Sequence, residues 1–173
     1  MAKNTIKLKK YLDIINEYTA TAVAITPGML IELITGCKVR AHATAGGNVL
    51  QMFALEDELQ GKGIDDNYAV SDKIQCWVAV RGEEVYAILV DGETVVCGDF
   101  LESNGAGFLQ KHNPDEYEGS LSIGGIFTNQ IVGIALEAMD LSTSSGEASS
   151  EGPGLESSIE TVGYNRRIKI RIK

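Results

Sequence analysis

Histidine and cysteine, the residues that most often carry chemistry in proteins, are few and widely spaced in this 173-residue chain. His42 lies in a strand-like pattern, and His112 comes directly before an Asn-Pro turn. Cys37, Cys76 and Cys97 lie much further apart than the cysteine pairs that hold zinc. No local signature joins a cysteine to a histidine as nucleophile and base. We therefore expect no catalytic residues, no metal and no cofactor, and we expect the thiols to be buried and reduced.

The glycine-rich and acidic stretches do not have the spacing of ligand sites either. Residues 61–63 and 124–125 lack the pattern of a phosphate-binding loop, so turns explain their glycines. The acidic residues 56–58 and 65–66 lack the order of ligands found in an EF-hand calcium loop. We expect these carboxylates to be solvated loop charges.

The charges are segregated along the chain, although their sum is only −9. The first ten residues carry four lysines and no acid, and the last eight carry five cations and no acid. The body between them holds all 24 acids and six bases, a net charge of −18. An acidic body argues against a general nucleic-acid binder. No apolar run approaches the roughly 18–20 residues of a membrane span, and the first residues lack the apolar core of a signal peptide.

Glycines that punctuate short apolar runs predict an all-β domain. We expect hairpins between 29–34 and 38–43, between 74–81 and 85–90, and between 100–102 and 108–111. The segment 130–140 fits both a helical and a strand period, and Gly133 favours the strand. Residues 49–55, 94–97 and 167–173 complete the predicted strands, and the last of these alternates isoleucines with cations.

Three regions follow from this pattern. Residues 1–20 form an extended basic and then apolar arm, residues 21–141 form a β-barrel body that the C-terminal strand 159–173 completes, and residues 142–158 form a flexible Ser/Gly/Glu-rich loop. The fold class is mainly β: a small β-barrel or β-tulip-like domain with an extended N-terminal arm and little helix. The alternation of residues 5–10 suits an extended arm, whereas the apolar residues between 8 and 15 also fit two helical turns.

An extended basic arm can add backbone hydrogen bonds and charge pairs at the sheet edge of a partner. The last strand adds a row of cations, and Trp77 shares a strand face with polar residues, where it fits either a contact surface or sheet packing. The candidate interface residues are Lys3, Lys7, Leu8, Lys9, Lys10, Tyr11, Leu12, Ile15, Trp77, Arg81, Arg167, Lys169 and Arg171.

Several stretches of the chain have a more specific sequence than strands and turns require. They are TPGMLIE at 26–32, AGGN at 45–48 and ALEDELQGKGIDD at 54–66, with the more generic GDFLE at 98–102. Together they resemble the capsid cement, or decoration, proteins of tailed bacteriophages. The resemblance covers roughly residues 1–141 and resumes at the C-terminal strand, and it does not extend to 142–158.

This resemblance implies a structural virion protein rather than an enzyme. Such a protein is made in the cytoplasm of the bacterial host, binds the outer surface of the expanded head and cements adjacent major capsid subunits. Its partners would be the major capsid protein and further copies of itself, with a trimer favoured, and neither a membrane nor nucleic acid. Two alternatives stay open: a small β-barrel ligand-binding module or enzyme, and a head fibre or spike that exposes residues 142–158 to the host.

Overall fold

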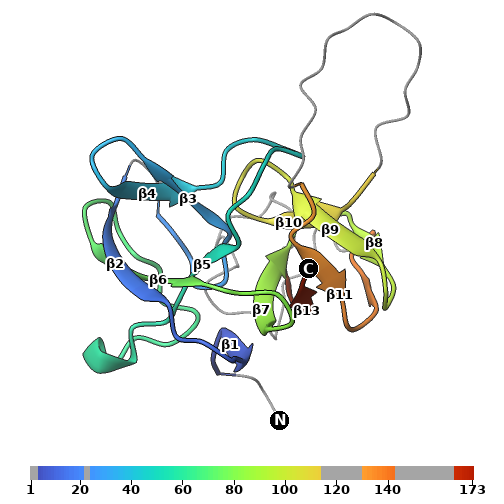
Figure 1. Ribbon diagram of the computed structural model, residues 1–173, viewed down its shortest axis with the longest axis horizontal. Coiled ribbons are helices and arrows are strands. Elements are labelled where there is room, and N and C mark those ends of the chain that lie inside the picture. Colours follow the sequence, from blue (N-terminus) through green and yellow to red (C-terminus); the bar gives the residue numbers. More distant parts are fainter. Residues whose placement is uncertain (1–3, 22–23, 114–129, 143–165) are drawn as a thin grey trace, which may run out of the picture.

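The computed structural model describes residues 4–21, 24–113, 130–142 and 166–173, and these residues form a mainly β fold (Figure 1). No α-helix occurs among them, and η1 (Glu58–Gln60) is a single 3₁₀ turn. The predicted fold class, a small mainly β barrel domain, is confirmed. The strands are β1 (Lys7–Lys9), β2 (Ile15–Ala20), β3 (Ile31–Ile34), β4 (Lys38–Ala41), β5 (Met52–Ala54), β6 (Lys73–Val78), β7 (Glu84–Leu89), β8 (Thr94–Val95), β9 (Phe100–Ser103), β10 (Leu109–Lys111), β11 (Gly133–Ala135), β12 (Met139–Asp140) and β13 (Arg166–Ile172).

Five strands pair in a ring and close a barrel, in the order β7, β10, β9, β11 and β13. The ring closes because β13 pairs with β11 on one edge and with β7 on the other. The β7–β13 ladder is the longest, from Arg166 opposite Leu89 to Arg171 opposite Glu84. Alternation along β13 buries Ile168, Ile170 and Ile172, as the sequence predicts.

The other sheet has the order β3, β4, β2, β6 and β5. A bridge between Leu30 and Phe53 joins its two ends, so this sheet also curls upon itself (Figure 1). Strand β6 is buried on both faces, because neighbouring residues Cys76 and Trp77 are both inaccessible to solvent. Their burial places β6 between two groups of core side chains.

Two predicted hairpins are present and one is wrong. Strands β3 and β4 pair with each other, as do β9 and β10. Strands β6 and β7 do not pair, because β6 lies between β2 and β5 while β7 lies in the barrel. The turn between them carries the chain from one sheet to the other. The segment 130–140 contains two short strands, β11 and β12, and no helix.

The N-terminal segment is not an arm outside the β-core, and this prediction is wrong. Strand β1 pairs with β7, and β2 pairs with β6 over five residues. Ile6 is fully buried, and its carbonyl accepts a hydrogen bond from Tyr86 N at 2.9 Å. The apolar residues of this segment therefore serve the core. The proposed loop at 142–158 lies outside the described residues except for Ser142.

Arg167 joins the barrel to loops that belong to the other half of the chain. Its guanidinium pairs with Asp65 at 2.7 Å and donates to the carbonyl oxygens of Pro27, at 3.1 Å, and Ile64. The side chain is buried, so it does not belong to a cationic outer face as predicted. Contacts with residues more than 100 positions away hold this guanidinium, so the alternation along β13 could not predict its burial.

Gly28 lies where the barrel meets the sheet formed by β3, β4, β2, β6 and β5. It donates to Ala54 O at 2.8 Å and accepts from Ile88 N at 3.3 Å, and its φ is +96°. A Cβ here would lie 3.0 Å from Tyr86 O, so we expect Gly28→Ala to lower the free energy of unfolding by about 2–3 kcal/mol. Gly36 has a φ of +82° and open space around it, so Gly36→Ala should cost only about 1 kcal/mol. Urea denaturation of both variants measures the difference, and equal losses would contradict a packed junction at Gly28.

Candidate interaction face

Strand β7 brings the two basic ends of the chain together. Strand β1 lies along one of its edges, where Lys9 is opposite Glu84. Strand β13 lies along the other edge, where Arg171 is opposite the same Glu84. The register therefore places Lys9, Glu84 and Arg171 next to one another across three strands, with Lys169 opposite Tyr86 in the next row. Cations that are about 160 residues apart in the sequence share one region of the surface.

Glu84 holds two of these cations in place. Its carboxylate pairs with Lys169 Nζ at 2.6 Å and with Arg171 NH2 at 2.8 Å. The hydrogen bonds from Lys169, and then from Arg171, lower the pKa of Glu84 from its ordinary 4.5 to about 2. One carboxylate balances two cations, and both cations keep part of their side chains exposed. The carboxylate of Glu137 also accepts a hydrogen bond from Lys169 N at 2.7 Å, so Lys9, Lys169 and Arg171 exceed the nearby carboxylates by one charge.

An exposed apolar segment lies beside the cations. We call Tyr11, Leu12, Ile14 and Ile15 the apolar rib; their exposed fractions are 63%, 54%, 42% and 40%. Lys9 Nζ lies 5.6 Å from the centre of the Tyr11 ring, within the range of a cation–π contact. Large apolar side chains that gather on a surface mark interaction sites more often than scattered ones do. The candidate site is thus an apolar rib next to a cationic face, and we call the two together the interaction face.

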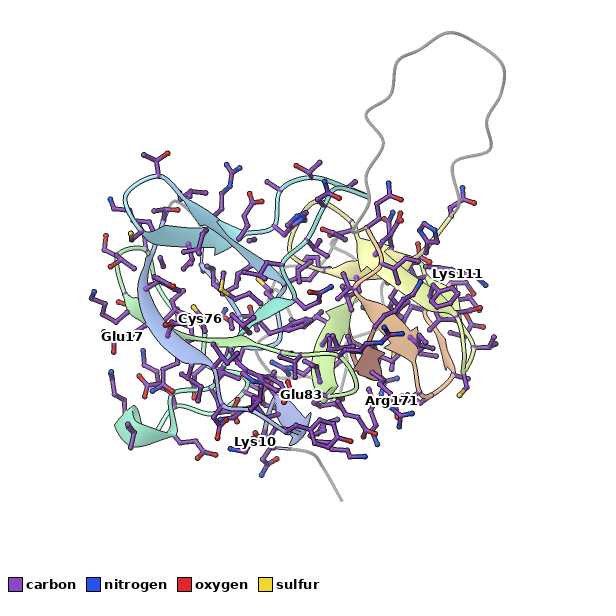
Figure 2. The ribbon with its side chains drawn as sticks, viewed as in Figure 1. Lys10, Glu17, Cys76, Glu83, Lys111 and Arg171 are labelled. Atoms are coloured by element: carbon purple, nitrogen blue, oxygen red, sulfur yellow. The ribbon has the colours of Figure 1, made fainter. Side chains whose placement is uncertain are left out.

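The buried carboxylate of Glu83 fixes the backbone of the rib. It accepts hydrogen bonds from Tyr11 N at 2.6 Å, Leu12 N at 2.8 Å and Val80 N at 2.6 Å. The indole of Trp77 donates to Leu12 O at 3.4 Å. In Figure 2, Lys10, Glu83 and Arg171 all lie in the lower part of the molecule. Buried side chains therefore fix the backbone of the rib, while the side chains of the rib face solvent. A fixed backbone loses less conformational entropy when a partner binds.

A second carboxylate anchors the start of the same segment. Glu56 accepts hydrogen bonds from Ile6 N at 3.2 Å and from the hydroxyl of Thr5. Glu56 and its neighbour Asp57 are buried, so the prediction that residues 56–58 are solvated charges is wrong for these two. Asp57 accepts from Gln60 N at the start of η1. These acids stay buried because backbone amides satisfy them.

Lysines and an aspartate surround the rib. Asp13 pairs with Lys10 and, at 3.7 Å, with Lys7. The hydrogen bond from Lys10 is the largest cause that lowers the pKa of Asp13. Lys7 and Lys10 thus share the single carboxylate of Asp13 at this end of the face.

The structure brings most of the predicted interface residues together and removes three of them. Trp77 is fully buried between the sheets, so the alternative of sheet packing holds for it, and Arg167 is buried at the junction. Lys3 lies outside the described residues. Arg81 is exposed in the turn before Gly82, which lies against the Tyr11 ring. Leu8, between Lys7 and Lys9 in β1, is half-buried and is not placed on the face. The predicted residues that the face contains are Lys7, Lys9, Lys10, Tyr11, Leu12, Ile15, Arg81, Lys169 and Arg171.

Glu83 and Glu84, which organise this face, are not among the predicted interface residues. Glu83 and Glu84 follow a glycine in a turn, where acidic residues are usually solvated. Glu83 lies 72 and 71 positions from the amides that it accepts. No local pattern reports such a contact, so only the tertiary fold identifies these residues.

His42 and Ser103 form the arrangement that most resembles a catalytic pair. The two side chains are 2.8 Å apart at Nδ1 and Oγ, and His42 Nε2 lies 3.1 Å from Asn48 O. Both residues are buried, and Ser103 Oγ also accepts from Gly105 N at 3.1 Å. Their contacts tie the β9–β10 loop to the end of β4, and a substrate has no access to the hydroxyl. Among the described residues, no group of three His, Cys, Asp or Glu side chains could hold a metal ion.

The cysteines differ from the sequence-based expectation in part. Cys76 is buried, and its burial raises the pKa of the thiol to about 12. Cys37 and Cys97 are exposed and free, so the prediction of buried thiols is wrong for them. Both lie at turns that precede or follow short strands, where side chains face solvent.

No protein-family model matches the chain, and no curated protein matches it. Within the described residues, no helix has the length and apolar character needed to cross a membrane.

Replacement of Glu83 tests how the rib is held. Glu83→Gln keeps the size of the side chain but replaces a carboxylate that accepts three amide hydrogens with a neutral amide. We expect a loss of about 3 kcal/mol in the free energy of unfolding and faster hydrogen exchange at the Tyr11 and Leu12 amides. The exposed Glu17→Gln is the matched control and should change neither quantity. Unchanged exchange at Tyr11 and Leu12 in Glu83→Gln would refute this role.

Replacement of Glu84 tests the cation pairing through pH. Because the pKa of Glu84 is lower in the folded protein than its ordinary 4.5, its ionised form stabilises the fold above that pH. This contribution is lost as the pH falls from 4.5 toward 2. The free energy of unfolding should therefore fall more steeply over this range in the wild type than in Glu84→Gln. Parallel pH profiles from urea titrations would show that the pairing adds no stability.

Proposed function

We propose that this protein is a capsid cement protein that binds the outer surface of a tailed-bacteriophage head through the interaction face. The observation that carries the proposal is the fixed apolar rib beside cations from both chain ends. The sequence resemblance to decoration proteins supplies the class of partner, the major capsid protein. A protein with this function acts by binding alone and needs no catalytic residues.

The charge distribution supports an acidic partner surface. The face gathers Lys9, Lys169 and Arg171, whereas the chain as a whole has a net charge of −9. An acidic capsid surface would attract the face and repel the acidic remainder, which orients the protein as it arrives. Apolar contacts at Tyr11 and Leu12 would then supply most of the free energy of binding. The acidic body would face solvent on the finished virion.

Cementing needs more than one contact for each molecule. A shell filled with DNA is under internal pressure, and a clamp strengthens it by adding interface area across the seams between subunits. A homo-oligomer, with a trimer favoured, would present several faces at once and gain affinity through effective concentration. The alternative of a host-facing spike depends on residues 142–158, of which the structure describes only Ser142.

Removal of the N-terminal segment is not a clean test, because Ile6 is a core residue. Substitutions of exposed residues on the interaction face test head binding without removing core residues. We expect the double variant Tyr11→Ser with Lys9→Glu to fold normally and to bind purified expanded heads at least about 100-fold more weakly, since it loses an aromatic anchor and reverses a charge. Co-sedimentation of labelled protein with heads measures the binding.

Leu59→Ser is the matched control, since Leu59 is 91% exposed in η1 and lies outside the face. It should bind heads as the wild type does. Binding of the wild type should also weaken as salt is raised, because exposed charge pairs are screened. Wild-type protein that does not bind heads at low salt, or a double variant that binds as the wild type does, would contradict the proposed function.

A further inference from the structure

Strand β2 has an edge that is only partly covered. On its other edge, β6 pairs with it from Ile15 to Thr19. Strand β4 pairs with β2 only at Thr19 and Ala20, because Lys38, its first residue, follows directly on the β3–β4 turn. Among the described residues, no strand pairs with β2 along residues 15–18 on this side, and we call this the open edge. Figure 1 shows β4 near only one end of β2.

The backbone groups on the open edge can be identified by alternation. Ile14 O accepts from Val78 N at 3.0 Å on the β6 side, whereas Thr21 N donates to Val39 O at 2.9 Å on the β4 side. Successive residues of a strand direct their N–H and C=O groups to opposite edges. The odd-numbered residues of β2 therefore direct their backbone N–H and C=O groups to the β4 side. Among them, Ile15 and Glu17 lie beyond the end of β4, so their groups point to the open edge. Unpaired groups of this kind are a template for another strand.

The side chains around the open edge specify an occupant. Ile15 and the adjoining Leu12 and Ile14 are exposed and apolar. Lys10, which shares the carboxylate of Asp13 with Lys7, precedes the rib at one end, and the exposed Lys38 stands at the other end, opposite Thr19. A second copy paired antiparallel at this edge would bring Lys10 of each copy toward Lys38 of the other. That arrangement places like charges together at both ends, so a different chain with acidic ends fits better.

We propose that the open edge of β2 takes up one extended segment of the protein partner as an additional strand. The segment has about four apolar or β-branched residues that cover Ile15, with an acidic residue toward Lys10 and another toward Lys38. Main-chain hydrogen bonds to Ile15 and Glu17 supply the affinity, and Lys10 and Lys38 favour a partner segment with an acidic residue at each end. The identity of the partner rests on the proposed function, whereas the edge itself does not.

A peptide can test this mode on the wild-type chain. The probe is an acetylated and amidated peptide of sequence Asp-Val-Thr-Val-Thr-Val-Asp, titrated into ¹⁵N-labelled protein. We expect chemical-shift changes and slower hydrogen exchange at the amides of Ile15 and Glu17. Two versions of the peptide, N-methylated on one or the other set of alternate residues, are then compared. Because only alternate peptide amides face β2, one version should bind about tenfold or more weakly and the other should bind as the parent peptide does.

Substitutions and a charge control complete the experiment. A peptide with Lys in place of both Asp residues should bind more weakly. Glu17→Pro removes an amide hydrogen from the open edge and should abolish the slowed exchange at Ile15, whereas Glu17→Thr keeps the amide and should bind normally. Equal binding of the two N-methylated peptides, changes confined to other residues, or self-association of the free protein through Ile15 and Glu17 would overturn the inference.

The outcomes also separate this inference from the proposed function. Peptide binding at the open edge without any binding to heads would support the strand edge and overturn the capsid role. Binding to heads that Glu17→Pro leaves unchanged, in a variant shown to be folded, would support the capsid role and overturn strand addition.

Discussion

The pairing of both chain ends with strand β7 is the constraint on which the rest of this structure depends. β13 closes the barrel against one edge of β7, and β1 covers part of the other edge. The same pairings place the basic residues of the two ends around Glu84. The pairings of β13 and β1 with β7 therefore determine both the closure of this sheet and the position of the cations on one face.

Burial of acids makes this arrangement stable. Glu83 and Glu56 are buried among backbone amides of the N-terminal segment, where each satisfies donors that no strand partner reaches. The cost of burying a carboxylate is offset because several amides bind it at once. The outcome is a segment with fixed backbone and exposed side chains, which suits a binding surface better than a free arm would.

Much of the fold follows from the sequence, because strand alternation and glycine turns are local signals. The isoleucines of β13 and the β3–β4 and β9–β10 hairpins were predictable for this reason. The partners of β6 and the burial of Arg167 were not, since each depends on a contact between distant segments. For the site, residue type and charge indicated the rib and the cations, whereas Glu83 and Glu84 carried no local signal that distinguishes them from solvated turn residues.

In the proposed function, the interaction face formed by β1, β7, β13 and the apolar rib contacts the major capsid protein. A cryo-EM reconstruction of expanded heads saturated with the protein tests it most directly. We expect Tyr11, Leu12 and Arg171 to lie against the major capsid protein while the β9–β10 hairpin points to solvent. Density in which the hairpin contacts the shell and the rib is exposed would contradict it.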